Sequence, residues 1–505
     1  MKNIAQLFLE AARKYPDHAA IIQGDRQIRY DQLAEQVRST AGYFRKKGIK
    51  PGDRVLVFVP MGIDLYRIVL ALFYMGAVAV FLDEWVSRER LALCCRMADC
   101  KAFVAGGKVR FLARFIQPVR KIPIWIGTSV PSAPAVDMKE VDESTSALIT
   151  FTTGSTGIPK AADRTHGFLK AQFDALLEEI NPQPGDVDMV VLPVVLLVNL
   201  GVGCTSVIAP FNARKPEKMK PDAIAGWIAN HHVNRIIASP YFIDRLAMWM
   251  LDNKQTFSSV QRIFTGGAPV FPLQAQTIRQ AFPDAGIRIV YGSTEAEPIA
   301  SVGADELLSE GRVTDGLYVG KVFHRTQVSI IGIWNREITV SDEGQLKVLE
   351  VPPGKIGEII VSGPHVLDRY YRNEEAFRRN KIMVDGKLWH RTGDSGYLGE
   401  DGRLYLTGRC EQIIRYGEKI YAPFVIEEML GRMDGVELGT MLLSEEQHPV
   451  VVVELKKGAD VQRVEEEVRN GIPDMERMQT VAKMPRDPRH HSKIDYEKLR
   501  KMVNG

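Results

Sequence analysis

The sequence predicts an α/β protein with a large N-terminal domain and a small, mobile α+β domain at its C-terminal end. Three observations lead to this fold class. Short apolar segments alternate with helical patterns up to about residue 316, half-exposed strand patterns follow, and a separate set of short helices and strands occupies residues 410–505. Alternation of the first kind is typical of parallel sheets covered by helices on both faces. At roughly 150 residues per domain, the 505 residues provide about three domain-sized units.

The first strand–helix–strand unit lies in the first hundred residues. Strands are predicted at Arg54–Val59 and Ala77–Leu82, because both segments are short and almost entirely apolar, and a helix is predicted over Asp64–Tyr74. The same pattern recurs along the chain. Further strands are predicted at 147–152, 235–238, 261–264 and 287–291, and a further helix at about 241–251.

The strand pattern changes near Leu317. Segments 328–331, 345–349 and 357–362 are typical of a more antiparallel, half-exposed sheet. They predict a β-rich subdomain at about 317–409, inside a large domain that spans 1–409. The C-terminal lid domain, 410–505, is predicted to contain helices near 422–433 and 459–470 and strands near 436–443 and 450–455.

The composition is that of an ordinary globular protein. Hydrophobic residues make up 45% of the chain and charged residues 25%, and the formal net charge is only +3. So small a net charge gives no reason to expect a nucleic-acid partner. The five cysteines are odd in number and sparse, which argues against a disulfide framework. The cluster Cys94, Cys95 and Cys100 is interpreted as buried thiols rather than a zinc site.

Segments that direct a protein to a membrane are not evident. The charged residues Glu10 and Arg13 interrupt the N-terminal helical pattern, so it is no signal peptide. Residues Met189–Ala213 carry no charge and are long enough to span a bilayer, but Pro193 and Pro210 interrupt them. We therefore predict a buried strand, a turn and a buried helix there, no transmembrane segment, no clear amphipathic membrane-binding signature and a cytoplasmic location.

The most informative stretch for function is residues 150–160, TFTTGSTGIPK, directly after a buried strand. Glycines let the backbone approach an anion, and hydroxyl groups and successive N–H groups bind phosphate oxygens. The spacing is not that of a Walker loop. The stretch predicts a phosphate-binding loop made of Thr152, Thr153, Gly154, Ser155, Thr156, Gly157 and Lys160.

Together with four later motifs, this loop resembles the adenylate-forming superfamily of acyl-CoA synthetases, peptide-synthetase adenylation domains and luciferases. The motifs are GGAP at 266–269, YGSTE at 291–295, RTGD at 391–394 and GR at 408–409, in the family's order over nearly the whole chain. The resemblance implies an ATP site. It assigns the adenine edge to Gly266, Gly267, Ala268 and Pro269, and an adenine-stacking ring to Tyr291, followed by Gly292 and Ser293. It assigns the α-phosphate to Thr294, Mg²⁺ to Glu295, and the ribose to Asp394 and Arg409.

The C-terminal domain carries two further residues that match the family. The tail MPRDPRHHSKIDY, residues 484–496, resembles the family's closing loop, and its lysine is Lys493, preceded by Ser492 where the family commonly has glycine. The resemblance gives this lysine a catalytic role at the carboxylate and the α-phosphate. The family rotates this domain about a hinge two residues after the Gly-Arg pair, which is Glu411 here. A carboxylate stands where the family usually has Asp or Lys.

The resemblance implies an AMP-forming acid ligase. Such an enzyme joins a carboxylic acid to ATP as acyl-AMP, releases pyrophosphate and needs Mg²⁺. The family's acid pocket maps near 189–203, where LPVVLLVNL at 192–200 replaces a common proline–aromatic–aromatic–histidine string. This apolar string favours a fatty acid over an amino acid. The predicted pocket residues are Leu196, Val198, Asn199 and Gly201.

Several second steps remain open from the sequence. Transfer of the acyl group to CoA is the preferred one, because residues 416–428 resemble an acyl-CoA-synthetase hinge segment. A closer resemblance to the olefin β-lactone synthetases, through PRDPRH at 485–490 and the histidine-free acid segment, implies ring closure of a 3-hydroxy fatty acid without CoA. Transfer to the phosphopantetheine of a carrier protein is a third alternative. A non-catalytic nucleotide-binding protein is a fourth, against which the intact Glu295, Asp394, Arg409 and Lys493 argue.

Overall fold

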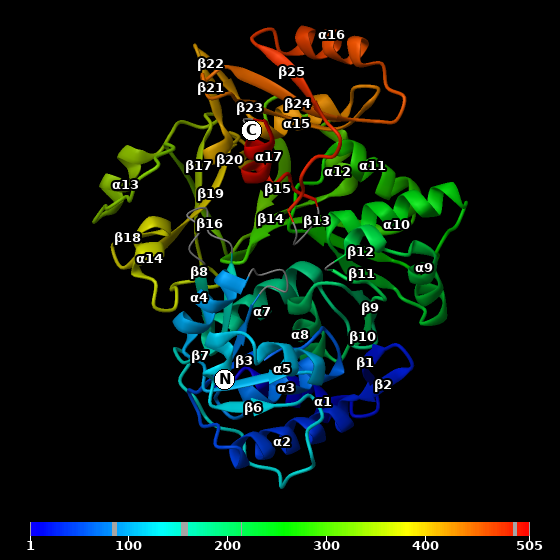
Figure 1. Cartoon of the computed structure of the whole chain (residues 1–505), viewed down its shortest axis with the longest axis vertical. Coiled ribbons are helices and arrows are strands. Elements are labelled where there is room, and N and C mark those ends of the chain that lie inside the picture. Colours follow the sequence, from blue (N-terminus) through cyan, green and yellow to red (C-terminus); the bar gives the residue numbers. More distant parts are fainter. Residues whose placement is uncertain (1, 83–87, 153–159, 214, 488–491, 504–505) are drawn as a thin grey trace.

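A computed structural model describes residues 2–82, 88–152, 160–213, 215–487 and 492–503, and all structural statements below concern these residues (Figure 1). The N-terminal sheet lies at the bottom of Figure 1, a long mixed sheet crosses the middle, and the C-terminal elements lie at the top. This arrangement confirms the predicted fold class of a large, sheet-rich N-terminal part and a small α+β part.

The N-terminal sheet has the order β6-β5-β3-β4-β7-β8 and is parallel except for its last pair, β7 and β8. Its strands are β3 (Arg54–Phe58), β4 (Val78–Phe81), β5 (Ala102–Ala105), β6 (Ile124–Ile126), β7 (Ser146–Thr152) and β8 (Lys160–Thr165). The first six described helices are α1 (Ala5–Lys14), α2 (Tyr30–Lys46), α3 (Ile63–Tyr74), α4 (Arg88–Ala98), α5 (Gly107–Ala113) and α6 (Gln117–Arg120). Helix α3 is buried on all sides, which explains its nearly continuous apolar sequence.

The second sheet has fourteen described strands. It is parallel from β1 to β13, apart from the edge hairpin of β1 and β2, and antiparallel from β14 onward. The parallel part contains β1 (Ala19–Gln23), β2 (Arg26–Arg29), β9 (Val187–Val190), β10 (Thr205–Ile208), β11 (Arg235–Ala238), β12 (Arg262–Gly266) and β13 (Gly286–Ser293). The antiparallel part contains β14 (Ala296–Gly303), β15 (Leu317–Val322), β16 (Gln327–Ile331), β17 (Gly357–Ser362), β18 (Lys381–Val384), β19 (Lys387–Leu398) and β20 (Arg403–Arg409).

Helices between these strands cover the second sheet. They are α7 (His166–Ile180), α8 (Pro193–Val202), α9 (Pro221–Asn230), α10 (Pro240–Asp252), α11 (Pro272–Ala281), α12 (Ala304–Ser309), α13 (Glu343–Leu349) and α14 (Glu374–Asn380), with a short 3-10 turn at Pro216–Lys218. The predicted strand at 345–349 is wrong, because this segment is helix α13. The Asp342 carboxylate accepts a hydrogen bond from the Gln345 backbone N–H at 2.9 Å and caps the helix.

Residues 189–213 also differ from the prediction. The structure places helix α8 directly between strands β9 and β10, so a strand, a helix and a second strand replace the expected strand, turn and helix. Pro193 begins α8 at its first turn, and Gly203 ends it in a left-handed conformation, φ 105°. Among the described residues, no helix is long and apolar enough to cross a membrane. The clustered Cys94, Cys95 and Cys100 are buried free thiols, as expected.

The C-terminal part follows Arg409. It contains a hairpin of β21 (Ile414–Tyr416) and β22 (Lys419–Tyr421), and a sheet of β23 (Val436–Leu443), β24 (Pro449–Leu455) and β25 (Arg477–Val481), with helices α15 (Pro423–Gly431), α16 (Val461–Gly471) and α17 (Tyr496–Val503). A core that includes Leu430, Val453 and Val468 is its own. The phenyl ring of Phe424 on α15 meets that of Phe271, before α11, edge to face at 5.8 Å. This contact joins the small part to the large one.

A buried charge network ties the parallel strands of the second sheet together. The fully buried Arg235 guanidinium on β11 lies 2.9 Å from the carboxylate of Asp186, just before β9, and 3.6 Å from that of Asp188, on β9. Asp186 also pairs with Arg262 on β12 at 2.8 Å. Asn199 of α8 donates a hydrogen bond to Asp188 at 2.8 Å. Since the two carboxylates are almost inaccessible to water, the arginine is their main compensation.

Replacing Arg235 with methionine should lower the free energy of unfolding by about 3–5 kcal/mol, because the fully buried Asp188 loses its ion-pair partner and Asp186 keeps only its pair with Arg262. Urea unfolding followed by tryptophan fluorescence measures the change. Arg262→Met is the matched control, since its side chain is 27% exposed and water can replace it at Asp186. Equal destabilisation by both variants would contradict the role given to Arg235.

Candidate active site

Three predicted ATP-binding residues from three strands meet at one end of the second sheet. Tyr291 of β13 donates its hydroxyl hydrogen bond to Asp394 Oδ2 at 2.8 Å. Arg409, at the end of β20, donates from Nη1 to Asp394 Oδ1 at 2.8 Å and to the Thr392 carbonyl at 3.0 Å. Asp394 on β19 pairs directly with Arg409 in the sheet register. Residues far apart in the sequence therefore form one connected polar group.

The backbone at Asp394 is shaped by its neighbours. Gly393 adopts φ +69°, and a side chain there would bring a Cβ within 2.9 Å of the Arg409 guanidinium, so glycine alone suits the position. Thr392 accepts a hydrogen bond from the Asp394 backbone N–H at 3.0 Å through its hydroxyl. These contacts hold the carboxylate toward both Tyr291 and Arg409.

The electrostatics of this group keep Tyr291 a neutral donor. Partial burial raises the pKa of the Tyr291 phenol well above its ordinary value, and the negative charge of Asp394 raises it further. The phenol therefore stays protonated and holds one carboxylate oxygen of Asp394. The Asp394 side chain is 18% exposed, so a carboxylate held in this way can still accept hydrogen bonds from a diol such as ribose.

Glu295 lies in the turn between β13 and β14, four residues after Tyr291 in the chain. Ser293 accepts hydrogen bonds through its hydroxyl from the backbone N–H groups of Glu295 and Ala296, both at 3.2 Å. The Thr294 carbonyl accepts from Arg164 of β8 at 3.2 Å. The two strands that flank the turn, and the glycine at 292, place the predicted Thr294 and Glu295 beside Tyr291.

A segment that the sequence did not single out holds Glu295 from the other side. The Leu367 backbone N–H donates to the Glu295 carbonyl at 2.6 Å, and the Tyr370 hydroxyl donates to Glu295 Oε1 at 3.2 Å. Tyr370 is bound in turn to β8 through a backbone bridge to Ala162. This segment therefore connects Glu295 to the strand that begins at Lys160.

Two lysines lie near Glu295. Lys160, the first residue of β8, donates from Nζ to Asn380 Oδ1 at 2.7 Å. Lys381 is 3% exposed, donates to the Leu367 carbonyl and lies 5.5 Å from the centre of the Tyr370 ring. Burial lowers the pKa of Lys381 to about 7, and the charge of Glu295 opposes this shift. A polyanion beside these lysines would favour their charged forms.

Replacing Tyr370 with phenylalanine should slow adenylate formation about tenfold, because the hydrogen bond that orients the Glu295 carboxylate is lost while the ring remains. Pyrophosphate release measured over a range of Mg²⁺ concentrations checks this, and the half-saturating Mg²⁺ concentration should rise. Tyr371→Phe is the control, because Tyr371 meets Arg54 and Arg372 through its ring. Unchanged Mg²⁺ dependence in Tyr370→Phe would contradict the positioning role.

The predicted phosphate loop is described in part. Thr152 ends β7 and Lys160 begins β8, so the loop connects the last two strands of the N-terminal sheet. Thr153, Gly154, Ser155, Thr156 and Gly157 lie outside the described residues. Arg164 of β8 donates to the Thr150 hydroxyl at 2.5 Å and ties the base of the loop to the Thr294 turn.

The predicted adenine segment follows β12. Gly266 pairs with Val290 in the sheet, directly before Tyr291, and a Cβ at Gly266 would lie 2.4 Å from the Val290 carbonyl oxygen. Gly267 has φ +83°, which glycine adopts without strain. The half-buried Ala268 and Pro269 come next. The structure thus brings residues 266–269 to the same end of the sheet as Tyr291.

The two predicted residues of the C-terminal part lie on turns. Asp487 donates its backbone N–H to the Lys493 carbonyl at 2.9 Å, and its carboxylate accepts from the Lys493 N–H at 3.0 Å, while the Lys493 side chain is exposed. The charge of Arg486, before this turn, opposes the burial that raises the pKa of Asp244 on α10 to about 6. Figure 1 shows this part of the chain reaching down toward α10 and β13.

Glu411 directly follows β20 in a 3-10 turn, Cys410–Gln412. Burial lowers the pKa of Lys160, and the charges of Glu295 and Glu411 oppose the shift. Glu411 therefore lies within electrostatic range of Lys160. The structure places this predicted hinge residue at the edge of the candidate site, where a movement of the small part would change its distance from Lys160.

The predicted acid-pocket residues lie in the packed core. Leu196, Val198 and Asn199 are at most 2% exposed, and Asn199 is held in the Asp188 network. Gly201 lies against the Phe173 ring, where a Cβ would approach within 2.6 Å. The cavity described below is not lined by these residues.

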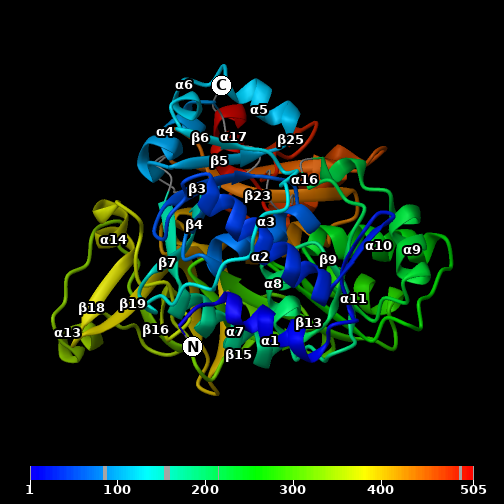
Figure 2. The ribbon, with the colours of Figure 1, turned by 90° about the horizontal axis from the view of Figure 1, so that it is seen from below.

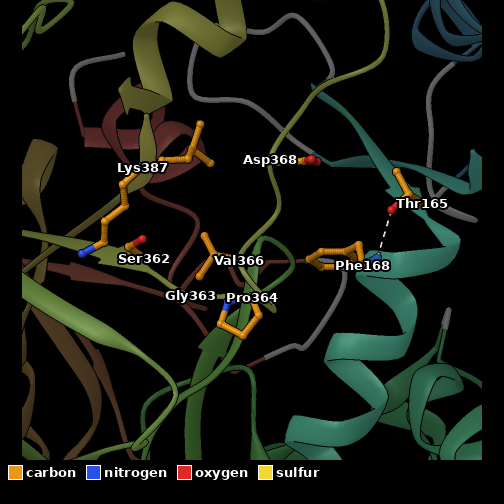
Figure 3. Close-up of a pocket in the computed structure, with 9 residues that line it drawn as sticks. Thr165, Phe168, Ser362, Gly363, Pro364, Val366, Asp368 and Lys387 are labelled. Atoms are coloured by element: carbon orange, nitrogen blue, oxygen red, sulfur yellow. Dashed lines mark hydrogen bonds between the residues drawn. The ribbon is translucent and has the colours of Figure 1, made fainter. Parts of the chain in front are cut away.

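A cavity of about 330 Å³ lies near the Glu295 segment (Figure 3). Figure 3 shows Ser362 and Lys387 on one side of Val366, and Thr165 and Phe168 on the other. The Thr165 hydroxyl accepts from the Phe168 N–H at 2.9 Å, which caps α7. Val366 bridges to Ala296, so the cavity shares this segment with the turn that carries Glu295.

Among the described residues, no group of three or more His, Cys, Asp or Glu side chains could hold a metal ion. Mg²⁺ commonly uses one or two carboxylates together with substrate phosphates, and Glu295 is the carboxylate that the sequence predicts for that role. Sequence reasoning missed Tyr370, Lys381 and Arg164, although the lysine stands out as a charge beside the apolar residues of β18.

Comparisons with known proteins agree with this geometry. A family model described as AMP-binding enzyme matches residues 8–371. The olefin beta-lactone synthetase of Stenotrophomonas maltophilia (strain K279a) is 29% identical over 98% of this chain and 97% of its own length. The 2-succinylbenzoate–CoA ligase of Bacillus cytotoxicus is 27% identical over 90% and 89% of the two chains. The amide bond synthetase McbA from Marinactinospora thermotolerans shares the fold, with a TM-score of 0.82, 21% identity and coverage of 99% and 100%.

These matches confirm the resemblance to adenylate-forming ligases and the fold class that it implied. The family model spans well over half of the chain and includes the turn that carries Tyr291 and Glu295. The protein therefore belongs to the AMP-binding enzyme family.

Proposed function

We propose that this enzyme activates a fatty acid with ATP, forming an acyl adenylate and releasing pyrophosphate. The observation that carries the proposal is the hydrogen-bonded group of Tyr291, Asp394 and Arg409, next to the Glu295 turn and the base of the predicted phosphate loop. Such a group offers carboxylate oxygens that can accept hydrogen bonds from the ribose hydroxyls, and it lies beside cations that can bind phosphate. An adenine nucleotide requires both.

In this proposal, a carboxylate oxygen of the acid attacks the α-phosphorus of ATP, and the bond to the β-phosphate breaks. The main barrier is the approach of one anion to another. Lys493 would neutralise charge where the carboxylate meets the α-phosphate, and Lys160 and Lys381 would face the departing pyrophosphate. Their pKa values, lowered by burial, would rise again beside the phosphates.

Glu295 would hold Mg²⁺ together with phosphate oxygens, and the ion would offset the negative charge of the phosphates. Tyr370 and the Leu367 N–H keep the Glu295 side chain and backbone in place. Asp394 would accept hydrogen bonds from the two ribose hydroxyls, with Tyr291 and Arg409 fixing its two oxygens. Each of these roles belongs to a described side chain.

For the second step, we propose ring closure of a 3-hydroxy fatty acid to a β-lactone. The 3-hydroxyl oxygen attacks the acyl carbon, the bond to the phosphate oxygen breaks, AMP leaves and the hydroxyl proton passes to solvent. Two relatives named olefin beta-lactone synthetase match 98% of this chain at 28–29% identity, whereas several CoA-ligase relatives match 85–90% of it at 25–28% identity. This difference moves the preference away from the CoA transfer that the sequence alone favoured.

Transfer to CoA is the second candidate, supported by the acyl-CoA-ligase relatives and by the segment at 416–428. Both steps are distinguished by one assay. The purified protein is mixed with ATP, Mg²⁺ and either dodecanoic or 3-hydroxydodecanoic acid, with and without CoA, and the products are identified by mass spectrometry.

A product formed from the 3-hydroxy acid without CoA, lighter than the acid by one water, supports the β-lactone step. An acyl-CoA that forms only when CoA is present supports the ligase instead. Acyl-AMP alone points to an acceptor such as a carrier protein. Absence of AMP and pyrophosphate with both acids would contradict the activation step itself.

A further inference from the structure

An exposed apolar cluster lies on the N-terminal part, away from the candidate active site residues in the chain. It is formed by Phe111 and Leu112 of α5 and by Phe115 just after it, whose side chains are 59%, 62% and 77% exposed. The two phenyl rings meet edge to face at 5.7 Å. Removing large aromatic and aliphatic side chains from water is favourable. Three such side chains together on the surface therefore indicate a site that binds another apolar surface.

The inner side of the same segment is packed. Ala113, Val119 and Ile122 are buried against a core that includes Phe103 and Cys94. The backbone of α5 and α6 is therefore fixed, and the large side chains project outward from it. Figure 2 shows α5 and α6 at the outer edge of the molecule, beyond β5 and β6.

The charge around the cluster has one sign. Residues 100–136 contain six basic residues and no aspartate or glutamate, although charged residues of both signs are interspersed elsewhere. Four of the six lie on exposed positions of the same segment, 107–121: Lys108, Arg114, Arg120 and Lys121. A surface that combines protruding aromatic side chains with only basic neighbours matches an anionic bilayer, whose headgroups attract the cations while its hydrocarbon accepts the rings.

We propose that the face formed by residues 107–121, here called the α5–α6 face, binds the surface of an anionic lipid bilayer. The inference does not depend on the reaction proposed above. The sequence showed no amphipathic signature because α5 has only seven residues and Phe115 lies beyond its end. The three-dimensional arrangement, rather than a long helical period, brings the apolar and basic side chains together.

The test is co-sedimentation of the full-length protein with vesicles of phosphatidylcholine alone or of phosphatidylcholine mixed with phosphatidylglycerol. Binding is expected to the mixed vesicles and to weaken as salt is raised. The combined variant Phe111→Ser, Leu112→Ser and Phe115→Ser should bind at least about tenfold more weakly. Its matched control is Val348→Ser, Leu273→Ser and Met248→Ser, at residues that are 83%, 49% and 46% exposed.

A second variant tests the charges. Changing Lys108, Arg114, Arg120 and Lys121 to glutamine should weaken binding to the mixed vesicles at least about a hundredfold, at roughly one order of magnitude for every one to two cations removed. Its control changes the exposed Lys46, Lys50, Lys254 and Lys355 to glutamine, which lowers the net charge equally. Thermal unfolding of each variant checks that the fold is retained.

If the wild-type protein binds neither kind of vesicle, the proposal is overturned. An acidic protein surface would then be the partner to test. Equal vesicle binding by the serine variant and its control would overturn it as well. Acid-dependent pyrophosphate release measured without vesicles should be unchanged in both variants. A failure of the reaction proposed above is therefore seen separately from a failure of the membrane proposal.

Discussion

Replacing Lys493 with alanine is expected to slow acid-dependent pyrophosphate release about 100- to 1,000-fold. The loss is large because a preorganised cation at the reacting α-phosphate stabilises charge that develops in the transition state. The Lys493 backbone N–H is held by the Asp487 carboxylate, and the charge of the neighbouring Arg486 acts on Asp244 of α10. The binding of ATP itself should change little, because Tyr291, Asp394 and Arg409 are untouched.

Lys498→Ala is the matched control for Lys493. Lys498 lies five residues later in the same small part, is exposed and pairs with Asp495 at 3.1 Å. Its removal should leave the rate of pyrophosphate release unchanged. If both variants kept the wild-type rate, the assignment of Lys493 to the reaction would be wrong; equal losses would mean that the small part as a whole had been disturbed.

Replacing Glu295 with glutamine should produce a loss of similar size, about 100-fold or more, in the rate of adenylate formation. Glutamine keeps the shape and can still accept the Tyr370 hydrogen bond, but it removes the negative charge that a divalent cation requires. The measurement is pyrophosphate release over a range of Mg²⁺ concentrations. Titration with a fluorescent ATP analogue, with and without Mg²⁺, gives a second readout that does not depend on turnover.

Glu306→Gln is the matched control for Glu295→Gln. Glu306 also accepts a tyrosine hydroxyl, that of Tyr318 at 2.5 Å, but it lies on α12 outside the candidate site. It should leave the Mg²⁺ dependence unaltered. A Glu295→Gln enzyme whose nucleotide binding responds to Mg²⁺ like the wild type would rule out Glu295 as the metal ligand.

Much of the candidate site could be predicted from short motifs. Tyr291 and Asp394 lie within β13 and β19, Arg409 ends β20, and each of the three is next to a glycine that is visible in the sequence. What the motifs could not provide was their contact, since the three residues come from strands far apart in the chain. The structure supplies it through two hydrogen bonds to Asp394.

Other features could not be predicted, for physical reasons. Gln345–Leu349 has the alternation of a strand, and only the capping contact from Asp342 shows why it is helical. Tyr370 and Lys381 lie in segments without a recognisable motif, and only the fold brings them to Glu295. Leu196 and Val198 of α8 are buried, and their place in the acid pocket stays a prediction.

The central claim is that the enzyme makes an acyl adenylate, and the products of ATP turnover test it most directly. The nucleotide products formed with ATP, Mg²⁺ and 3-hydroxydodecanoic acid should be separated by chromatography and quantified. We predict AMP and pyrophosphate in equal amounts, formed only when the acid is present, and lost in the Lys493→Ala enzyme. Formation of ADP and inorganic phosphate, or AMP formation that does not depend on any carboxylic acid, would contradict the claim.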